Sequence, residues 1–106
     1  MIVIAHNIRS LHNVGSVFRS ADVFDAEHIY LTGYTGIPPR KEIAKTALGS
    51  EHRVKWTRYE NVIELLEQLK KDGYRIIALE TGEGSISLNS LESTDKDVVI
   101  LGNEVE

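Results

Sequence analysis

Short, uninterrupted runs of apolar residues alternate along this chain with longer segments of helical periodicity. Residues 2–5 form one such run, Ile-Val-Ile-Ala, which is typical of a parallel strand that is buried on both faces. From Asn13 the period changes to the i, i+3, i+4, i+7 spacing of one helix face. The apolar positions of that face are Val14, Val17, Phe18, Ala21 and Phe24. Strands that alternate with helices require right-handed crossovers, so the pattern predicts a mainly parallel sheet.

The whole chain follows this alternation, so residues 1–106 are expected to form a single domain. Strands are expected at residues 2–5, 28–33, 54–59, 75–79 and 97–101. Helices are expected at residues 13–25, 40–48 and 62–71. Asn13 is the expected N-cap of the first helix, and Glu60 or Asn61 that of the last. The predicted fold class is α/β, with a mainly parallel five-stranded sheet and flanking helices.

The end of the chain breaks the alternation. The sequence Gly-Asn-Glu-Val-Glu follows the last predicted strand, and no helix is predicted after it. A buried parallel strand needs a helix on its face, so we expect the fifth strand to be uncovered and the domain to lack its C-terminal part. Uncovered strand surface favours oligomerisation or domain swapping.

Composition excludes several classes of protein. The chain has no cysteine, which excludes disulfides and thiolate metal sites, and its four histidines show no metal-ligand spacing. No apolar run approaches the roughly 20 residues of a membrane span, and the N-terminus has no signal-peptide pattern, so we expect a cytoplasmic protein. The net charge of −4 argues against a purely electrostatic nucleic-acid binder, and no DNA partner is expected.

A polar stretch at residues 7–22 joins the first strand to the first helix. It carries Arg9 and Arg19 but a single acid. Either arginine alone is more simply explained as a solvated or salt-bridged surface residue. However, Asn13 and Gly15 flank a helix N-terminus, whose amides attract anions, at the edge where α/β sheets bind ligands. A guanidinium fork beside a bare glycine backbone suits a phosphodiester, so the stretch predicts a grip on RNA ribose and phosphate.

Two other kinds of ligand site fit the loops less well. Thr81-Gly82-Glu83-Gly84 follows a predicted strand as a dinucleotide-binding turn would, but Ser87 stands where the third glycine is required. A flavodoxin-like small-molecule site would need a phosphate-binding loop beyond the helix start at Asn13, and none is evident. Glu104 follows Gly102 at the edge where parallel strands end, which makes this glutamate a candidate for the same site as the arginines.

Two segments resemble motifs of the SpoU/TrmH-type RNA ribose 2′-O-methyltransferases of the SPOUT superfamily. The first is Asn13-Val14-Gly15-Ser16-Val17-Phe18-Arg19-Ser20-Ala21, preceded by Asn7-Ile8-Arg9-Ser10, and the second is Val99-Ile100-Leu101-Gly102-Asn103-Glu104. Lys45-Thr46-Ala47-Leu48-Gly49 also fits small bacterial members. The resemblance extends through essentially the whole chain. It implies an α/β-knot fold, S-adenosylmethionine as methyl donor, a tRNA or rRNA substrate and a homodimer.

The resemblance also implies roles for individual residues. Arg19 would engage the target phosphate and help to activate the ribose 2′-hydroxyl, with Asn13 beside it, and Glu104 would support the active-site geometry. The RNA-binding residues would be Asn7, Arg9, Asn13, Gly15 and Arg19. The residues of two cofactor-binding loops would be Leu79, Glu80, Thr81, Gly82, Leu101, Gly102 and Asn103. A metal is not expected, because the sulfonium already carries the reactive methyl group.

Chains of that family continue past the second motif with a helix and a third motif that closes the knot. This chain ends at Glu106, so the resemblance implies a truncated domain that binds S-adenosylmethionine weakly or not at all, whereas the parent protein is expected to be active. The alternative is a non-catalytic RNA-binding or dimerising module, which would keep Arg9, Asn13 and Arg19 but lack a cofactor pocket.

Overall fold

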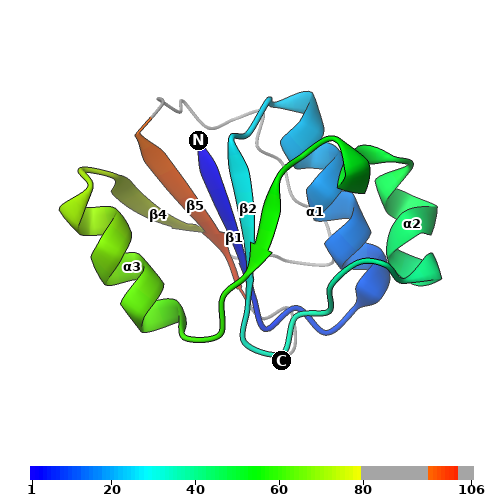
Figure 1. Cartoon of the computed structure of the whole chain (residues 1–106), viewed down its shortest axis with the longest axis horizontal. Coiled ribbons are helices and arrows are strands. Elements are labelled where there is room, and N and C mark those ends of the chain that lie inside the picture. The colour runs from blue at the N-terminus through cyan, green and yellow to red at the C-terminus, as the bar shows by residue number, and fades with distance from the viewer. Residues whose placement is uncertain (80–95, 103–106) are drawn as a thin grey trace.

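The computed structural model describes residues 1–79 and 96–102, which form one parallel five-stranded sheet with helices on both sides (Figure 1). The strands are β1 (Ile2–His6), β2 (His28–Thr32), β3 (Trp56–Arg58), β4 (Arg75–Leu79) and β5 (Asp97–Leu101), in the order β3-β2-β1-β5-β4. The helices are α1 (Leu11–Val23), α2 (Lys41–Ala47) and α3 (Val62–Lys71), with a 3₁₀ turn η1 (Ser50–His52) after α2. The predicted α/β fold with a parallel sheet is confirmed.

The sheet separates two apolar layers, because successive side chains of a strand point to opposite faces. On β1, Val3 and Ala5 belong to the larger core with α1 and α2, whereas Ile2 and Ile4 belong to a smaller core with α3. Figure 1 shows α1 and α2 together on one side of the sheet and α3 on the other. All four of these β1 side chains are buried. Burial on both faces therefore explains the continuous apolar run at the N-terminus.

Helix α1 begins earlier than predicted. Its N-cap is Ser10 rather than Asn13, since the Ser10 backbone is extended and its Oγ accepts a hydrogen bond from the Asn13 amide at 3.2 Å. Serine and asparagine are equally good caps, so residue preference alone could not decide between them. Asn13 lies in the first turn instead. The helix ends at Val23, and Asp25 adopts a left-handed φ of 58° beyond it.

The other boundaries lie closer to those predicted. Asn61 caps α3, because its Oδ1 accepts from the amides of Ile63 at 3.0 Å and Glu64 at 3.2 Å. Strand β3 is shorter than the predicted 54–59, since it lies at the edge of the sheet and pairs with β2 over three residues.

The expectation that the fifth strand is left uncovered is wrong. β5 lies inside the sheet between β1 and β4, and Val98, Val99 and Leu101 are buried. Asp97 is buried as well and accepts two hydrogen bonds from Arg75, at 3.0 and 3.1 Å. Hydrophobic periodicity does not specify strand order, which is why the sequence could not place β5. The expectation of oligomerisation or domain swapping through this strand stays a prediction.

Helices α1 and α2 approach each other closely at Gly15. A Cβ atom at this position would overlap Thr46 Oγ1 and the carbonyl oxygen of Ile43, both in α2. Thr46 Oγ1 donates a hydrogen bond to the carbonyl oxygen of His12 at 2.6 Å, in the first turn of α1. Gly15 thus sets the separation of the two helices that cover the larger core.

Two half-buried histidines are hydrogen-bonded to threonines of neighbouring strands. His6 Nδ1 lies 2.9 Å from Thr32 Oγ1, and His28 Nε2 lies 2.7 Å from Thr57 Oγ1. Burial lowers the pKa of His6. Burial also lowers the pKa of His28, with a further lowering by Lys55 and an opposing effect of Glu27. Both imidazoles are therefore held in the neutral form near pH 7.

Substitution of Gly15 by alanine is expected to destabilise the fold by about 1–3 kcal/mol, because the added methyl group would force α1 and α2 apart. This loss would occur although alanine has the higher helix propensity. Urea denaturation measures the change. The matched control is Ser20→Ala in the same helix, which is expected to stay within about 0.5 kcal/mol of the parent. Equal stability of the two variants would contradict the close contact.

The histidines predict that the protein loses stability as the pH falls below about 6.5. A lowered pKa in the folded state means that the unfolded chain binds more protons in this range, so acid favours unfolding. Thermal unfolding followed by circular dichroism between about pH 7.5 and pH 5 measures this slope. The double variant His6→Asn/His28→Gln keeps the hydrogen-bonding nitrogens but does not titrate, and it should show a smaller slope. An unchanged slope would contradict the assignment.

Candidate functional site

The carboxyl ends of β1 and β2 carry two loops that are tied together through Asn7. This residue has a left-handed φ of 55°, and its amide donates to the carbonyl oxygen of Thr32 at 3.2 Å. Its side-chain Oδ1 accepts a hydrogen bond from the amide of Tyr34 at 3.0 Å. Gly33 leaves room for this contact, because a Cβ there would overlap Asn7 Oδ1. The structure therefore gives Asn7 an architectural role, beside which its predicted contact with RNA stays a prediction.

Hydrogen bonds of buried threonine hydroxyls to the backbone also hold these two loops in place. Thr35 Oγ1 donates to the carbonyl oxygen of Ala5 at 3.0 Å and accepts from the amide of Ile8 at 2.9 Å. Thr35 and Thr32 are both buried, so these bonds lie away from water, where they hold the backbone firmly. The segment that leads from β1 into α1 is consequently held in one conformation before any ligand arrives.

The sequence prediction missed these threonines and the hydrogen bond of His6. Hydroxyl residues at the end of an apolar strand, Thr32 and Thr35, could have indicated bonds to a neighbouring loop. However, a single sequence does not show which loop lies next to which, so their partners could not be inferred.

The residues that were predicted to bind RNA take different positions around the start of α1. Arg9 precedes the N-cap and is exposed, whereas Asn13 is half-buried in the first turn, and each makes an interaction within the chain. Gly15 is buried against α2. Helix packing therefore explains its missing side chain, and its predicted contact with RNA stays a prediction.

Arg19 lies on the exposed surface of α1, and no described residue pairs with its guanidinium. The nearest acid along the helix, Asp22, accepts instead from Arg53, with its Oδ2 at 2.8 Å from Nη2 and 2.9 Å from Nε. Six residues of helix separate Arg19 from Asn13, which places them about 9 Å apart along the axis and about 120° apart around it. They therefore do not share one face of α1, and His12 and Ser16 lie closer to the face of Arg19.

The predicted cofactor loops begin at the ends of adjacent strands. Leu79 and Leu101 are register partners at the carboxyl ends of β4 and β5, so the loops after them start side by side. Gly102 follows Leu101, and a Cβ added there would meet no described atom within 4 Å. Paired strand ends at the carboxyl edge of a parallel sheet fit a ligand held across this edge. The other predicted residues, Glu80, Thr81, Gly82, Asn103 and Glu104, lie outside the described residues, so their roles stay predictions.

The part of the chain that the structure describes holds no group of three or more histidine, aspartate or glutamate side chains placed to bind a metal ion. It also contains no helix that is long and apolar enough to cross a membrane.

Curated relatives of this chain are RNA methyltransferases. The tRNA (guanosine(18)-2′-O)-methyltransferase of Aquifex aeolicus (strain VF5) is 25% identical over 109 residues, which cover 100% of this chain and 50% of that protein. A putative TrmH family tRNA/rRNA methyltransferase of Staphylococcus saprophyticus is 23% identical over 97% of this chain and 41% of that protein. The chain thus spans half or less of the length of these relatives.

Solved structures share the fold. The AdoMet-bound rRNA methyltransferase of Sinorhizobium meliloti has a TM-score of 0.75 and 28% identity, covering 97% of this chain and 39% of that one. The TrmH/SpoU tRNA modifying enzyme of A. aeolicus has a TM-score of 0.76 at 23% identity, covering 99% and 53%. The family model of the SpoU rRNA Methylase family matches residues 1–106, the whole of the chain. The chain therefore belongs to the SpoU rRNA Methylase family.

Proposed function

We propose that the protein transfers a methyl group from S-adenosylmethionine to a ribose 2′-hydroxyl of tRNA or rRNA. The observation that carries this proposal is Arg19, an exposed guanidinium in the first family motif that no described residue pairs with. Family membership and relatives named as RNA methyltransferases support the general activity. That the acceptor is a ribose 2′-hydroxyl, and that this chain itself transfers the methyl group, are parts of what we propose.

A ribose hydroxyl is a poor nucleophile near pH 7, so the site has to hold it in line with the methyl donor and favour loss of its proton. The Arg19 guanidinium would bind the neighbouring phosphate through two parallel hydrogen bonds, which fixes the ribose in place. Its positive charge would also stabilise the negative charge that develops on the 2′-oxygen. The fixed loop from β1 to α1 would hold Arg9 and the first turn of α1 against other phosphates of the same RNA.

S-adenosylmethionine would supply an electrophilic methyl group on its sulfonium. We propose that Leu79, Leu101 and Gly102 line its site, together with the predicted residues Glu80, Thr81, Gly82 and Asn103. The paired ends of β4 and β5 support this placement. A homodimer is proposed on the family resemblance alone, as are the catalytic roles of Asn13 and Glu104. A cytoplasmic location is proposed from the sequence.

Substitution of Arg19 by alanine is expected to lower the rate of methyl transfer by about 100- to 1,000-fold, the usual loss when one donor to a developing anion is removed. The assay measures radiolabelled methyl groups in total tRNA and rRNA, with this chain and with the whole gene product that contains it. Arg19→Lys keeps the charge but loses the fork, so it should recover only part of the rate. Lys71→Ala, on the exposed surface of α3, is the matched control.

Two results would count against this proposal. Methyl transfer at the parent rate by Arg19→Ala would remove the assigned role of the arginine. RNA binding by the whole gene product without any methyl transfer would favour the non-catalytic RNA-binding module instead.

Substitution of Gly102 by valine is expected to weaken binding of S-adenosylmethionine at least tenfold, because the side chain would fill space that the cofactor needs. Isothermal titration with the whole gene product measures the affinity, and urea denaturation measures the stability. Unchanged affinity in a folded variant would place the cofactor elsewhere.

A further inference from the structure

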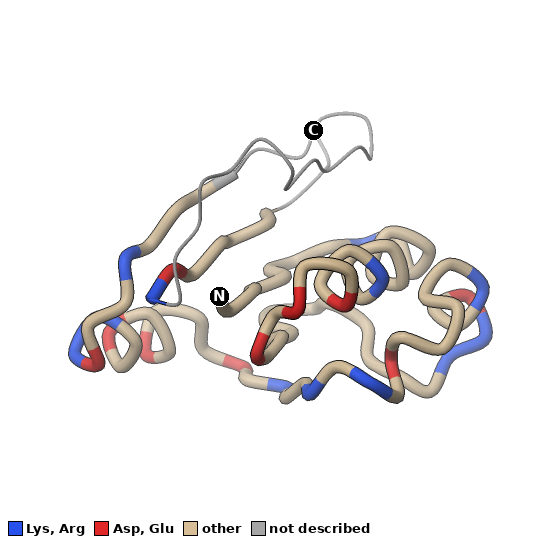
Figure 2. Tube along the Cα trace, turned by 90° about the horizontal axis from the view of Figure 1, so that it is seen from above, with Lys and Arg blue, Asp and Glu red and all other residues tan. Residues whose placement is uncertain are grey.

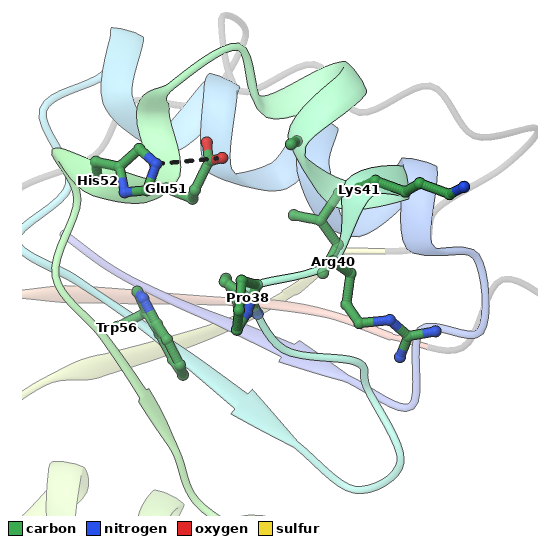
Figure 3. A pocket seen from close by; sticks show the side chains of 9 residues that line it. Pro38, Arg40, Lys41, Glu51, His52 and Trp56 are labelled. Atoms are coloured by element: carbon green, nitrogen blue, oxygen red, sulfur yellow. Dashed lines mark ion pairs between the residues drawn. The ribbon is translucent and has the colours of Figure 1, made fainter.

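A pocket of about 510 Å³ lies between α2 and the edge strand β3, and none of the residues predicted to bind RNA lines it. Its volume lies within the range of sites for small molecules and nucleotides. Figure 3 shows Pro38 and Trp56 on one side of the pocket and Glu51 and His52 on the other. The residues that line it are Pro38, Pro39, Arg40, Lys41, Ile43, Ala44, Glu51, His52 and Trp56.

Glu51 is the unusual residue of this pocket. Its side chain is only 10% exposed, and its Oε1 is buried without a hydrogen-bond partner among the described residues. Its Oε2 lies 3.8 Å from His52 Nε2, which is too long for a hydrogen bond. A buried carboxylate oxygen without a donor is costly, and such groups in native proteins call for an explanation. The terminal torsion of glutamate turns easily, so either oxygen can face a donor placed in the pocket.

Trp56 supplies an aromatic surface in the same pocket. It is half-buried, packs against the larger core and is the one tryptophan of the chain. Tryptophan at the wall of a pocket is suited to stacking on an unpaired nucleobase. An aromatic ring beside a buried acceptor favours a planar ligand that carries N–H donors on its edge.

Two cations lie at the rim of the pocket. Arg40 and Lys41 are exposed, and Figure 3 shows both side chains pointing away from the interior. Figure 2 shows basic positions at the α2 end of the molecule, although the whole chain is acidic. Cations outside an aromatic pocket match the phosphates on either side of a base that is inserted into it.

We propose that this pocket binds an unpaired guanine of the RNA substrate, separate from the ribose that is methylated. Guanine carries two adjacent N–H donors, N1–H and the N2 amino group, which match a carboxylate that presents both oxygens. Glu51 would turn its buried Oε1 toward the pocket when the base binds. Its ring would stack on Trp56, and its flanking phosphates would lie against Arg40 and Lys41. The proposal rests on the proposed function, because it takes the occupant to be part of the same RNA.

The surrounding contacts connect this pocket to the motif helix. Thr46 of α2 is hydrogen-bonded to the first turn of α1. The 3₁₀ turn η1 carries Glu51 and His52, and Arg53, which follows it directly, is hydrogen-bonded to Asp22 of α1. A guanine bound here would therefore be held at a fixed distance from Arg19. Such a contact would select RNA sequences in which a guanine lies near the methylated nucleotide.

The single tryptophan provides the test, because its fluorescence reports directly on the pocket. Titration of the chain with GMP should quench Trp56 fluorescence saturably, and GMP should bind roughly tenfold more tightly than IMP, which lacks the N2 amino group, or UMP. Glu51→Gln offers one acceptor instead of two, so it should abolish most of the difference between GMP and IMP. Lys70→Ala, on the far side of the sheet, is the matched surface control.

A second measurement does not depend on tryptophan fluorescence. Trp56→Ala should weaken binding of a short single-stranded RNA that contains guanine by roughly tenfold or more, whereas Trp56→Phe should retain most of the affinity. Circular dichroism confirms that each variant is folded.

Two outcomes would overturn the proposal. The first is the absence of saturable quenching by GMP up to about 10 mM, and the second is equal affinity for GMP and IMP. Neither readout involves methyl transfer. Selective GMP binding by a protein that methylates nothing would support the pocket while refuting the proposed function, and methyl transfer without GMP binding would do the reverse.

Discussion

The hydrogen bond from the Tyr34 amide to Asn7 Oδ1 holds together the two loops on which the candidate site depends. These loops leave adjacent strands, β1 and β2, and the first continues directly into the motif helix α1. Asn7 can make this contact because its backbone is left-handed, a conformation that asparagine tolerates better than most residues, and because Gly33 has no side chain. A substitution at either position would disturb the direction in which α1 leaves the sheet.

The packing of α1 on α2 fixes the position of the motif helix relative to its neighbour. Gly15 brings the helices into contact, and the Thr46 hydroxyl joins them at the first turn of α1. Arg19 lies one turn beyond Gly15 on the same helix, so its position relative to α2 follows from the same contact. The motif glycine and the motif arginine thus have different tasks. The glycine positions the helix, and the arginine is presented at its surface.

Much of the fold could be predicted from the sequence, because period and composition determine whether a segment becomes a strand or a helix. The strands at 2–5 and 97–101 and the Asn61 cap are instances, since burial on both faces and a good capping residue each leave a local signature. The N-cap of α1 was misplaced because Ser10 and Asn13 are both suitable caps, and the choice depends on the tertiary contacts of the preceding loop. The position of β5 inside the sheet depends on strand order, which no local pattern contains.

The candidate site was predictable to a smaller degree. The sequence indicated Arg9 and Arg19 as chemically important, but it could not show that Gly15 faces α2 or that Asn7 joins two loops. It gave no sign of the pocket at Trp56, because that pocket arises where a 3₁₀ turn and an edge strand meet a helix from another part of the chain. Residues that act through such long-range contacts are recognised only when the packing is known.

The ion pairs explain how an acidic protein can still present a basic site. Asp22 would be the natural partner of Arg19, three residues away on the same helix, yet its Oδ2 accepts a hydrogen bond from Arg53 Nε and is ion-paired with Nη2 of the same guanidinium. Arg75 likewise neutralises the buried carboxylate of Asp97. The first of these pairs removes a negative charge that would otherwise compete with an RNA phosphate for Arg19. The net charge of −4 therefore says little about the site, because the field at Arg19 depends on which neighbouring carboxylates are already paired.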